Sequence, residues 1–268
     1  MKPTIIEARD LPDAWYQCLY EILRVEEKGT GRVYKIDKGS YKGQERLEFG
    51  HVTVGIKFPE IRPLAPDVPA SSGIPPPTSQ EYIDKYLPYL LTDVVAKNEQ
   101  YTYGERLVGP KLRLKEKLVR RALGEESDSN KIIEISADIN PVEKVIEMYK
   151  NMFAKDGGYG TNQATLEIGM PHDIDLADPP CLRIIDTEIN EIDGEQKLNF
   201  IAYFRSWDLW GGFPTNLGGL QLMKEYMAQE IGVLPGETIA SCKSLHLYDD
   251  VWEIANQLTY NIKKDDLK

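Results

Sequence analysis

Hydrophobic residues recur at helical spacing in two long stretches of the chain. The first spans residues 11–25 and carries Trp15, Leu19, Ile22 and Leu23. The second spans residues 217–231 and carries Leu220, Met223, Met227 and Ile231. Residues three and four positions apart share one face of an α-helix. We therefore predict two amphipathic helices, with Cys18 a packing residue on the first.

Shorter stretches have the alternation or the β-branched and aromatic content of β-strands. The predicted strands span residues 47–58, 164–168, 182–189, 198–204 and 238–247. Residues 190–196 are rich in Asn, Asp and Gly, which favour turns. We therefore predict that the strands on either side of that turn form a hairpin.

Capping signals predict further helices. One begins at Thr78 or Ser79, with Glu81 placed to complete a capping box, and runs towards Val95 with a kink at Pro88. Another follows the cap at residues 140–141 and extends to about residue 153, and residues 249–260 form a closing helix. The proline-dense residues 63–77 predict an extended surface connector.

Two segments have a weaker signal. Residues 101–106 favour a loop or a short strand, and the cations between Lys111 and Arg121 favour one solvated helix face running to Leu123. Mixed strands with interspersed helices indicate an α+β or α/β-type fold, with a mixed β-sheet flanked by helices. We expect residues 1–268 to form a single domain.

Composition excludes several classes of protein. The formal net charge of −11 disfavours a nucleic-acid binder, because such binding depends on neutralising phosphates. No stretch is apolar enough to cross a membrane or to serve as a signal peptide, so we expect a cytoplasmic protein. The cysteines, Cys18, Cys181 and Cys242, are few and far apart, which fits reduced thiols. No histidine has the spacing of a zinc site, so we expect no metal.

Candidate chemistry gathers in two neighbouring segments, Asp178-Pro-Pro-Cys181 and Arg205 to Asn216. A cysteine attacks as its thiolate, and a nearby guanidinium lowers the pKa of the thiol and can also clamp a phosphate. A side-chain amide can read a heterocycle through a donor and an acceptor together. The segments therefore indicate nucleophilic attack on an anionic, nitrogen-heterocyclic substrate.

These motifs, in this order, resemble the thymidylate synthase family. The resemblance rests on Pro179-Pro-Cys181, on Arg205-Ser206-x-Asp208 with Gly212-x-Pro214-x-Asn216, and on His246-x-Tyr248, with a looser echo at residues 101–106. It is strongest from residue 161 to about residue 257, and the overall length suggests a compact archaeal-type branch. It implies a thymidylate synthase-like fold, a homodimer, and reductive methylation of dUMP to dTMP with methylene-tetrahydrofolate or a related pterin as co-substrate.

The resemblance also implies roles for individual residues. Cys181 would be the nucleophile, Arg205 and Ser206 would bind the phosphate, Asp208 would hydrogen-bond the folate ring, and Asn216 would read the uracil. An aspartate in place of Asn216 would instead favour the cytosine pattern.

The sugar and the proton-transfer step would involve other residues. His246 and Tyr248 alternate along a strand, so their side chains project to one face and could hold the sugar hydroxyl. Tyr103 resembles the family tyrosine near the proton-abstraction step. The catalytic glutamate lacks its usual surroundings, and Glu81 is the candidate.

Each assignment has a structural alternative. Cys181 could be a small buried hydrophobe, Arg205 a surface ion-pair partner, and His246 a satisfied core residue. Asp208 could cap a turn, and Asn216 could be the N-cap of the helix that begins at Leu217. The alternative for Tyr103 is a packed aromatic ring beside Gly104.

Two departures from the family pattern matter for function. Where the family has phosphate-binding arginines from the partner subunit, this chain has Thr161-Asn-Gln163, and Arg46, Lys38 or the Lys111–Arg121 cluster could substitute. The chain also stops soon after the last helix, without the family's carboxyl-terminal lid, and water in an open site could trap an intermediate. The alternatives are therefore a pyrimidine nucleotide hydroxymethylase of the same fold and a non-catalytic nucleotide-binding or protein-interaction paralogue.

Overall fold

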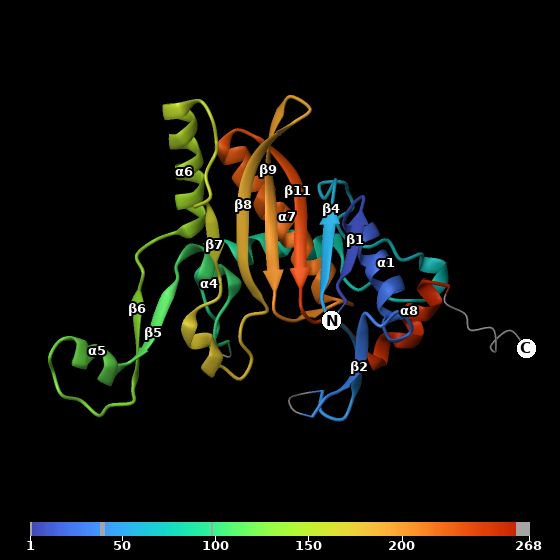
Figure 1. Cartoon of the computed structure of the whole chain (residues 1–268), viewed down its shortest axis with the longest axis horizontal. Helices are drawn as coiled ribbons and strands as arrows, with labels where there is room; N and C mark the ends of the chain where they lie inside the picture. Colours follow the sequence, from blue (N-terminus) through green and yellow to red (C-terminus); the bar gives the residue numbers. More distant parts are fainter. Residues whose placement is uncertain (1, 38–40, 98, 261–268) are drawn as a thin grey trace, which may run out of the picture.

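The computed structural model of the protein describes residues 2–37, 41–97 and 99–260. Within these residues, six strands form a mixed sheet in the order β1-β4-β11-β9-β8-β7, flanked by helices (Figure 1). The strands are β1 (Thr4–Ala8), β4 (Val52–Ile56), β11 (Leu234–Cys242), β9 (Glu195–Phe204), β8 (Leu182–Ile192) and β7 (Thr165–Glu167). The predicted α+β class is confirmed, and so is the hairpin of β8 and β9.

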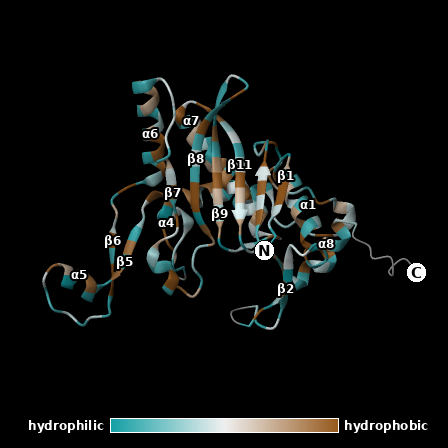
Figure 2. Cartoon of the chain, viewed as in Figure 1, coloured by the Kyte–Doolittle hydropathy of each residue, from teal (hydrophilic) through white to brown (hydrophobic). Residues whose placement is uncertain are grey.

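One face of this sheet forms the hydrophobic core. Val54, Ala240, Ala202 and Ile185 lie in register on neighbouring strands and are each at most 1% exposed. The helices α1 (Leu11–Ile22) and α7 (Gly212–Ile231) bury their apolar sides in the same core. Figure 2 shows the hydrophobic residues along the central strands. The alternation of buried and exposed positions sets which side chains reach the helices.

Helix α7 begins before the predicted start at residue 217. Gly211 is its N-cap, so Asn216 lies within the helix and the predicted N-cap role for Asn216 is wrong. Gly218 and Gly219 let helix α3 (Gln80–Leu90) approach closely, because a Cβ at Gly219 would stand 2.1 Å from the Tyr86 ring. This contact brings Tyr86 to Asn216.

A second sheet splits two of the predicted strands. In the described residues it has the order β10-β12-β3-β2, with β10 (Trp207–Asp208), β12 (Leu245–Tyr248), β3 (Glu45–Phe49) and β2 (Gly31–Lys35). The predicted strand 47–58 is β3 followed by β4, and the predicted strand 238–247 is β11 followed by β12. The chain changes sheet within each stretch, which an alternating pattern alone does not mark.

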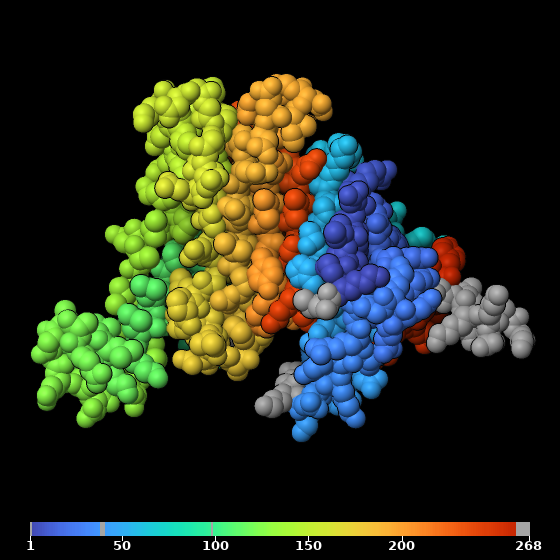
Figure 3. Space-filling model, in the orientation of Figure 1, coloured from blue at the N-terminus to red at the C-terminus, as the bar shows by residue number. Residues whose placement is uncertain are grey.

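Residues 111–136 form an arm that projects from the body (Figures 1 and 3). The arm contains β5 (Lys111–Lys115), α5 (Glu116–Ala122) and β6 (Ile132–Ser136). The prediction of one helix over residues 111–123 is therefore wrong for its first half. Lys111 to Lys115 alternate polar and apolar side chains and pair in an antiparallel ladder with β6, so the two-residue period decides.

Local capping explains two further corrections. Residues 101–106 were expected to be a loop or strand, but helix α4 (Tyr103–Val108) begins there because the Thr102 side chain accepts from the Glu105 N–H at 2.9 Å. Helix α3 is capped by Ser79, which accepts from the Tyr82 N–H at 3.1 Å, so Glu81 does not complete the predicted capping box.

The remaining helices follow the prediction closely. Helix α6 (Pro141–Asp156) has Asn140 as its N-cap, with the side chain accepting from the Glu143 N–H at 3.1 Å. Helix α8 (Trp252–Leu258) follows a short 3-10 turn, and α2 (Val25–Lys28) is a single extra turn after α1. Of the helices in the described part of the chain, none has the length and apolar character needed to span a bilayer.

Candidate active site

Cys181 stands at the entrance to β8, at the end of the turn that begins at Asp178. Its carbonyl oxygen accepts from the backbone N–H of Arg205 at 2.8 Å, so the strand hairpin fixes the two residues side by side. The thiol is half-buried, whereas Cys18 and Cys242 are each 0% exposed. Cys181 is thus the cysteine among the three that a substrate can approach.

The Arg205 side chain folds back over this turn. Its Nε donates to the Pro180 carbonyl at 3.1 Å, and its Nη2 donates to the Pro179 carbonyl and to the Asp178 carboxylate, the latter at 3.2 Å. The Asp178 side chain is 90% exposed, so this ion pair is screened by solvent and easily exchanged. The guanidinium is held beside Cys181 but keeps a replaceable anionic partner.

Opposing effects act on the Cys181 thiol. Burial raises its pKa and Asp178 adds to the rise, while the cations Arg205 and Arg183 oppose it. Burial raises the pKa of Cys242 to about 12, although a backbone hydrogen bond from Ser244 opposes the rise. Arg205 and Arg183 thus favour the thiolate of Cys181 against the effect of burial.

A cavity of about 650 Å³ opens beside Arg205 and is strongly basic. Arg205 and Ser206 line one side, and the cations Lys2, Arg32, Arg46 and Lys243 also line it. Arg32 and Arg46 share the buried carboxylate of Glu48, at 3.0 and 2.6 Å. More cations than carboxylates face this cavity, which suits a phosphate.

A second cavity, of about 500 Å³, opens beside Asp178. It is lined by Asp178, Asn216 and the tyrosines Tyr86, Tyr89, Tyr101 and Tyr103. The Tyr103 hydroxyl accepts from the Leu182 N–H at 3.2 Å, next to Cys181. Burial raises the pKa of Tyr103, so the hydroxyl keeps its proton at neutral pH.

Asn216 borders the second cavity and a third cavity of about 700 Å³. Its Oδ1 accepts from the Trp207 indole Nε1–H at 2.9 Å, and its Nδ2 donates to the Tyr86 hydroxyl at 2.9 Å. An amide oxygen has two lone pairs and an amide nitrogen two hydrogens. These two bonds use half of that capacity.

Asp208 caps the turn that leads into α7. Its carboxylate accepts from the backbone N–H groups of Trp210, Gly211 and Gly212 at 3.2, 2.9 and 2.8 Å. The predicted structural alternative, a turn cap, is therefore present. Gly211 and Gly212 also line the third cavity, so Asp208 shapes its wall.

His246 and Tyr248 lie on one face of β12, as their alternation predicts. Their rings meet edge to face with centroids 4.9 Å apart, and Tyr248 stacks on Tyr41 at 4.3 Å. His246 is 4% exposed and its Nδ1 donates to the Ser244 carbonyl at 3.0 Å. Burial lowers the pKa of His246, and the nearby Arg46 lowers it further.

A buried ion-pair network lies next to the turn of residues 178–181, here called the cysteine turn. Asp173 is 1% exposed and accepts from Arg106 at 3.0 Å and from Arg183 at 2.8 Å. Arg106 lies on α4 with Tyr103, and Arg183 follows Cys181 by two residues. The carboxylate thus ties the helix that carries Tyr103 to the strand that carries Cys181.

Comparison with known proteins agrees with this geometry. The thymidylate synthase family model matches residues 138–266. A protein named "Putative thymidylate synthase" from Methanosarcina mazei is 27% identical over 96% of this chain and 95% of its own length. Relatives of the same name from Methanococcoides burtonii and Methanosarcina acetivorans are 27% and 28% identical, over 93% and 96% of this chain and 91% and 95% of their own lengths.

Over residues 138–266 the chain is thus similar to the thymidylate synthase family. The matched region begins just before α6 and contains the cysteine turn, Arg205 to Asn216, and β12. The relatives extend the similarity to the amino-terminal part of the chain, which contributes Arg32, Arg46 and Tyr86.

Other predicted residues of the family site lie elsewhere. The Glu81 carboxylate is exposed and binds Lys85 at 2.5 Å, and it is not among the described residues that line the three cavities. Gln163 is exposed before β7. Among the described hydrogen bonds and ion pairs, the Glu81 carboxylate binds Lys85 and no residue of the turn that ends at Cys181.

The candidates for replacing the family's phosphate-binding arginines differ in whether they line the basic cavity. Arg46 lines the basic cavity with Arg205. In the Lys111–Arg121 cluster, Arg113 binds Glu105 and Glu134, and Arg120 binds Glu116 and Glu125. Lys38 lies outside the described residues.

The sequence did not predict that Tyr86 and Trp207 form hydrogen bonds with Asn216, or that Asp173 binds Arg183 close to Cys181. Tyr86 stands on a different helix and 130 residues away from Asn216, so no local pattern connects them. Trp207 lies between Ser206 and Asp208, and its presence in that motif was the available signal. Asp173 belongs to none of the motifs described above, so no signal in the sequence pointed to it.

Proposed function

We propose that this protein catalyses the reductive methylation of dUMP to dTMP through a covalent adduct on Cys181. The observation that supports this most is the position of Arg205. Its guanidinium is bonded to the turn of Cys181 and lines the basic cavity. A nucleotide whose phosphate enters that cavity would place its base near the thiol, and orientation of this kind accelerates the attack.

The proposed chemistry begins with addition of the Cys181 sulfur to the ring carbon conjugated with the uracil carbonyl. A carbon–sulfur bond forms and the neighbouring carbon becomes the nucleophile that takes the one-carbon unit. Loss of the proton from that carbon would expel the pterin, and a hydride from the pterin would reduce the attached one-carbon unit to a methyl group as the carbon–sulfur bond breaks. The product nucleotide and the Cys181 thiolate would then separate. The Tyr103 hydroxyl, bonded to Leu182, is the nearest described candidate to assist the proton step.

Binding of the nucleotide divides between the cavities in this proposal. Arg205, Ser206 and Arg46 hold the phosphate, and Asn216 reads the uracil edge. Asp178 is displaced from Arg205 as the phosphate enters. His246 and Tyr248 hold the sugar hydroxyl from β12.

The third cavity suits a pterin. It is bounded by Pro76, Pro77, Tyr82 and Tyr86 and by the backbone capped by Asp208, and its volume of about 700 Å³ is typical of small-molecule sites. Methylene-tetrahydrofolate or a related pterin would supply the one-carbon unit and the reducing equivalent there. The proposal needs no metal, and in the described residues no group of three or more His, Cys, Asp or Glu side chains could hold one.

A second copy of the chain would cover the open face of the six-stranded sheet. Ile201 and Ile239 are directly paired on β9 and β11, and they are 37% and 40% exposed. Ile5 on β1 is 74% exposed on the same face. Apolar side chains at the centre of an open sheet favour a homodimer.

The test is incubation with fluoro-dUMP and methylene-tetrahydrofolate, followed by intact mass and peptide mapping, with Cys181→Ala as the control. A ternary adduct on Cys181 supports the proposal. Product analysis with dUMP then separates dTMP from the hydroxymethyl nucleotide that a hydroxymethylase of this fold would form. If the protein forms no adduct and dUMP does not raise its unfolding temperature, the result would instead indicate a non-catalytic paralogue.

A further inference from the structure

The hydrogen-bond partners of Asn216 determine which way its side-chain amide is turned. Trp207 contributes an indole N–H, which can only donate. The atom of Asn216 that faces this N–H at 2.9 Å must therefore be the oxygen. The nitrogen then faces Tyr86, whose hydroxyl accepts at 2.9 Å.

The two partners differ in how strictly they set this orientation. A phenol hydroxyl can rotate to donate or to accept, so Tyr86 would tolerate either face of the amide. The indole would not, because a reversed amide would point its NH₂ group at the Trp207 N–H and leave a buried donor without an acceptor. Trp207 thus selects the orientation and Tyr86 follows it.

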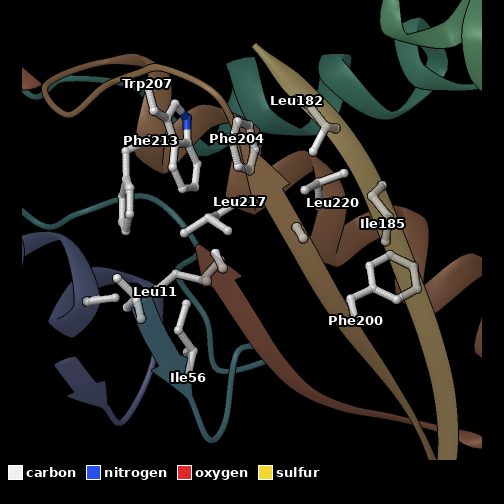
Figure 4. Packing of buried hydrophobic residues seen from close by; sticks show 14 of the residues in the cluster. Leu11, Ile56, Leu182, Ile185, Phe200, Phe204, Trp207, Phe213, Leu217 and Leu220 are labelled. Atoms are coloured by element: carbon white, nitrogen blue, oxygen red, sulfur yellow. The ribbon is translucent and has the colours of Figure 1, made fainter. Parts of the chain in front are cut away.

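The indole itself is held rigidly. Trp207 is 3% exposed and lies between two phenylalanine rings, stacked on Phe204 at 3.7 Å and tilted against Phe213 at 4.5 Å (Figure 4). Its strand, β10, pairs with β12. A donor locked in this way cannot swing aside to accommodate a reversed amide.

We propose that Trp207 is a specificity-determining residue, which orients the Asn216 amide so that the site accepts a uracil edge and rejects a cytosine edge. Uracil presents a carbonyl acceptor beside a ring N–H donor, and cytosine presents an amino donor beside a ring-nitrogen acceptor. The same amide matches one base in one orientation and the other base when reversed. The inference rests on the proposed function, because it concerns the base read by that site.

The test compares dUMP and dCMP binding by calorimetry for the full chain and three variants. Trp207→Phe removes the indole donor and keeps an aromatic ring, and Tyr86→Phe removes only the hydroxyl. Trp252→Phe is the matched control, because the Trp252 indole donates to the Leu247 carbonyl at 2.8 Å and not to Asn216. Unfolding temperatures show whether each variant is folded.

We expect the ratio of dCMP to dUMP dissociation constants to fall about tenfold or more in Trp207→Phe, the size of one lost hydrogen-bond preference. Tyr86→Phe and Trp252→Phe should keep the wild-type preference for dUMP. An unchanged ratio in a folded Trp207→Phe, or the larger loss in Tyr86→Phe, would overturn the inference while the proposed function stands. A wild-type protein that binds neither nucleotide, or that prefers dCMP, would overturn both.

If Trp207→Phe does not fold, the indole signal of the wild-type protein decides. In ¹⁵N-labelled protein, Asn216→Leu should shift the Trp207 indole resonance and speed its hydrogen exchange, and Tyr86→Phe should leave it protected. An indole resonance that ignores Asn216→Leu would contradict the proposed bond.

Discussion

The Nε of Arg205 donates to the carbonyl oxygen of Pro180 at 3.1 Å. The guanidinium that lines the basic cavity is therefore bonded to the residue that precedes Cys181. Binding of an anion and reactivity of the thiol are coupled through this contact, since a cation beside a thiol stabilises the thiolate.

This coupling predicts a change in thiol reactivity. Replacing Arg205 by Gln removes a charge that opposes the raised pKa of Cys181, so the pKa should rise further. We expect alkylation of Cys181 by iodoacetamide to slow about fivefold at pH 8 and its rate profile to move to higher pH. Peptide mapping follows the rate. Arg62→Gln, which breaks a surface pair with Glu225, should leave the profile unchanged.

Phosphate recognition predicts a second result. Arg46→Gln should weaken dUMP binding about tenfold or more, because it removes a charge-assisted contact in the basic cavity. Deoxyuridine, which lacks the phosphate, should bind the variant and the wild type alike. Titration calorimetry with both compounds makes the comparison.

The arm provides the control for that result. Arg113→Gln breaks the ion pairs with Glu105 and Glu134, and Arg113 does not line the basic cavity. It should leave the dUMP affinity intact. Loss of affinity in Arg113→Gln but not in Arg46→Gln would assign the phosphate to the Lys111–Arg121 cluster instead.

The buried carboxylate of Asp173 predicts a loss of stability. Asp173→Asn removes the nearer carboxylate partner of Arg106, which is 0% exposed, and leaves only Glu105 at 4.0 Å among its described carboxylate partners. Breaking one side of a buried ion pair costs about 3–5 kcal/mol. Urea denaturation should show a loss of this size, whereas Asp175→Asn, on an exposed residue of the same turn, should change little. Equal stability of the two variants would contradict the role given to Asp173.

Lys224 predicts a pH dependence. The lysine is fully buried on α7 and donates to the Gly236 carbonyl and the Thr238 hydroxyl at 2.6 and 2.7 Å. Burial lowers its pKa to about 7. The unfolded chain, with an ordinary lysine pKa near 10.4, then binds more protons between these values, so the free energy of unfolding rises with pH across that window.

The comparison is with Lys224→Met. The wild-type protein should gain stability over this variant between pH 7 and pH 9, by up to about 1.4 kcal/mol for each pH unit. Urea denaturation at both pH values measures the difference. Parallel pH dependence in the two proteins would mean that Lys224 stays charged in the fold.

The sequence by itself determined the class of fold, the hairpin of β8 and β9, and helices α1 and α6, and it singled out Cys181, Arg205 and Asn216 as candidates. These features depend on side chains close together in the chain: the helical period, the Asn140 cap, and motifs within a few residues of one another. Their local free energies already favour the observed structure.

Tertiary structure decided what depends on distant contacts. The stretch 238–247 divides between two sheets because pairing partners, not its own alternation, determine where each half lies. Tyr86 reaches Asn216 because Gly219 admits α3 against α7. Arg46, not the arm, joins Arg205 because β3 pairs beside β12. Such contacts form only when the core is packed, so their effect on Cys181 and Asn216 has no local signal in the sequence.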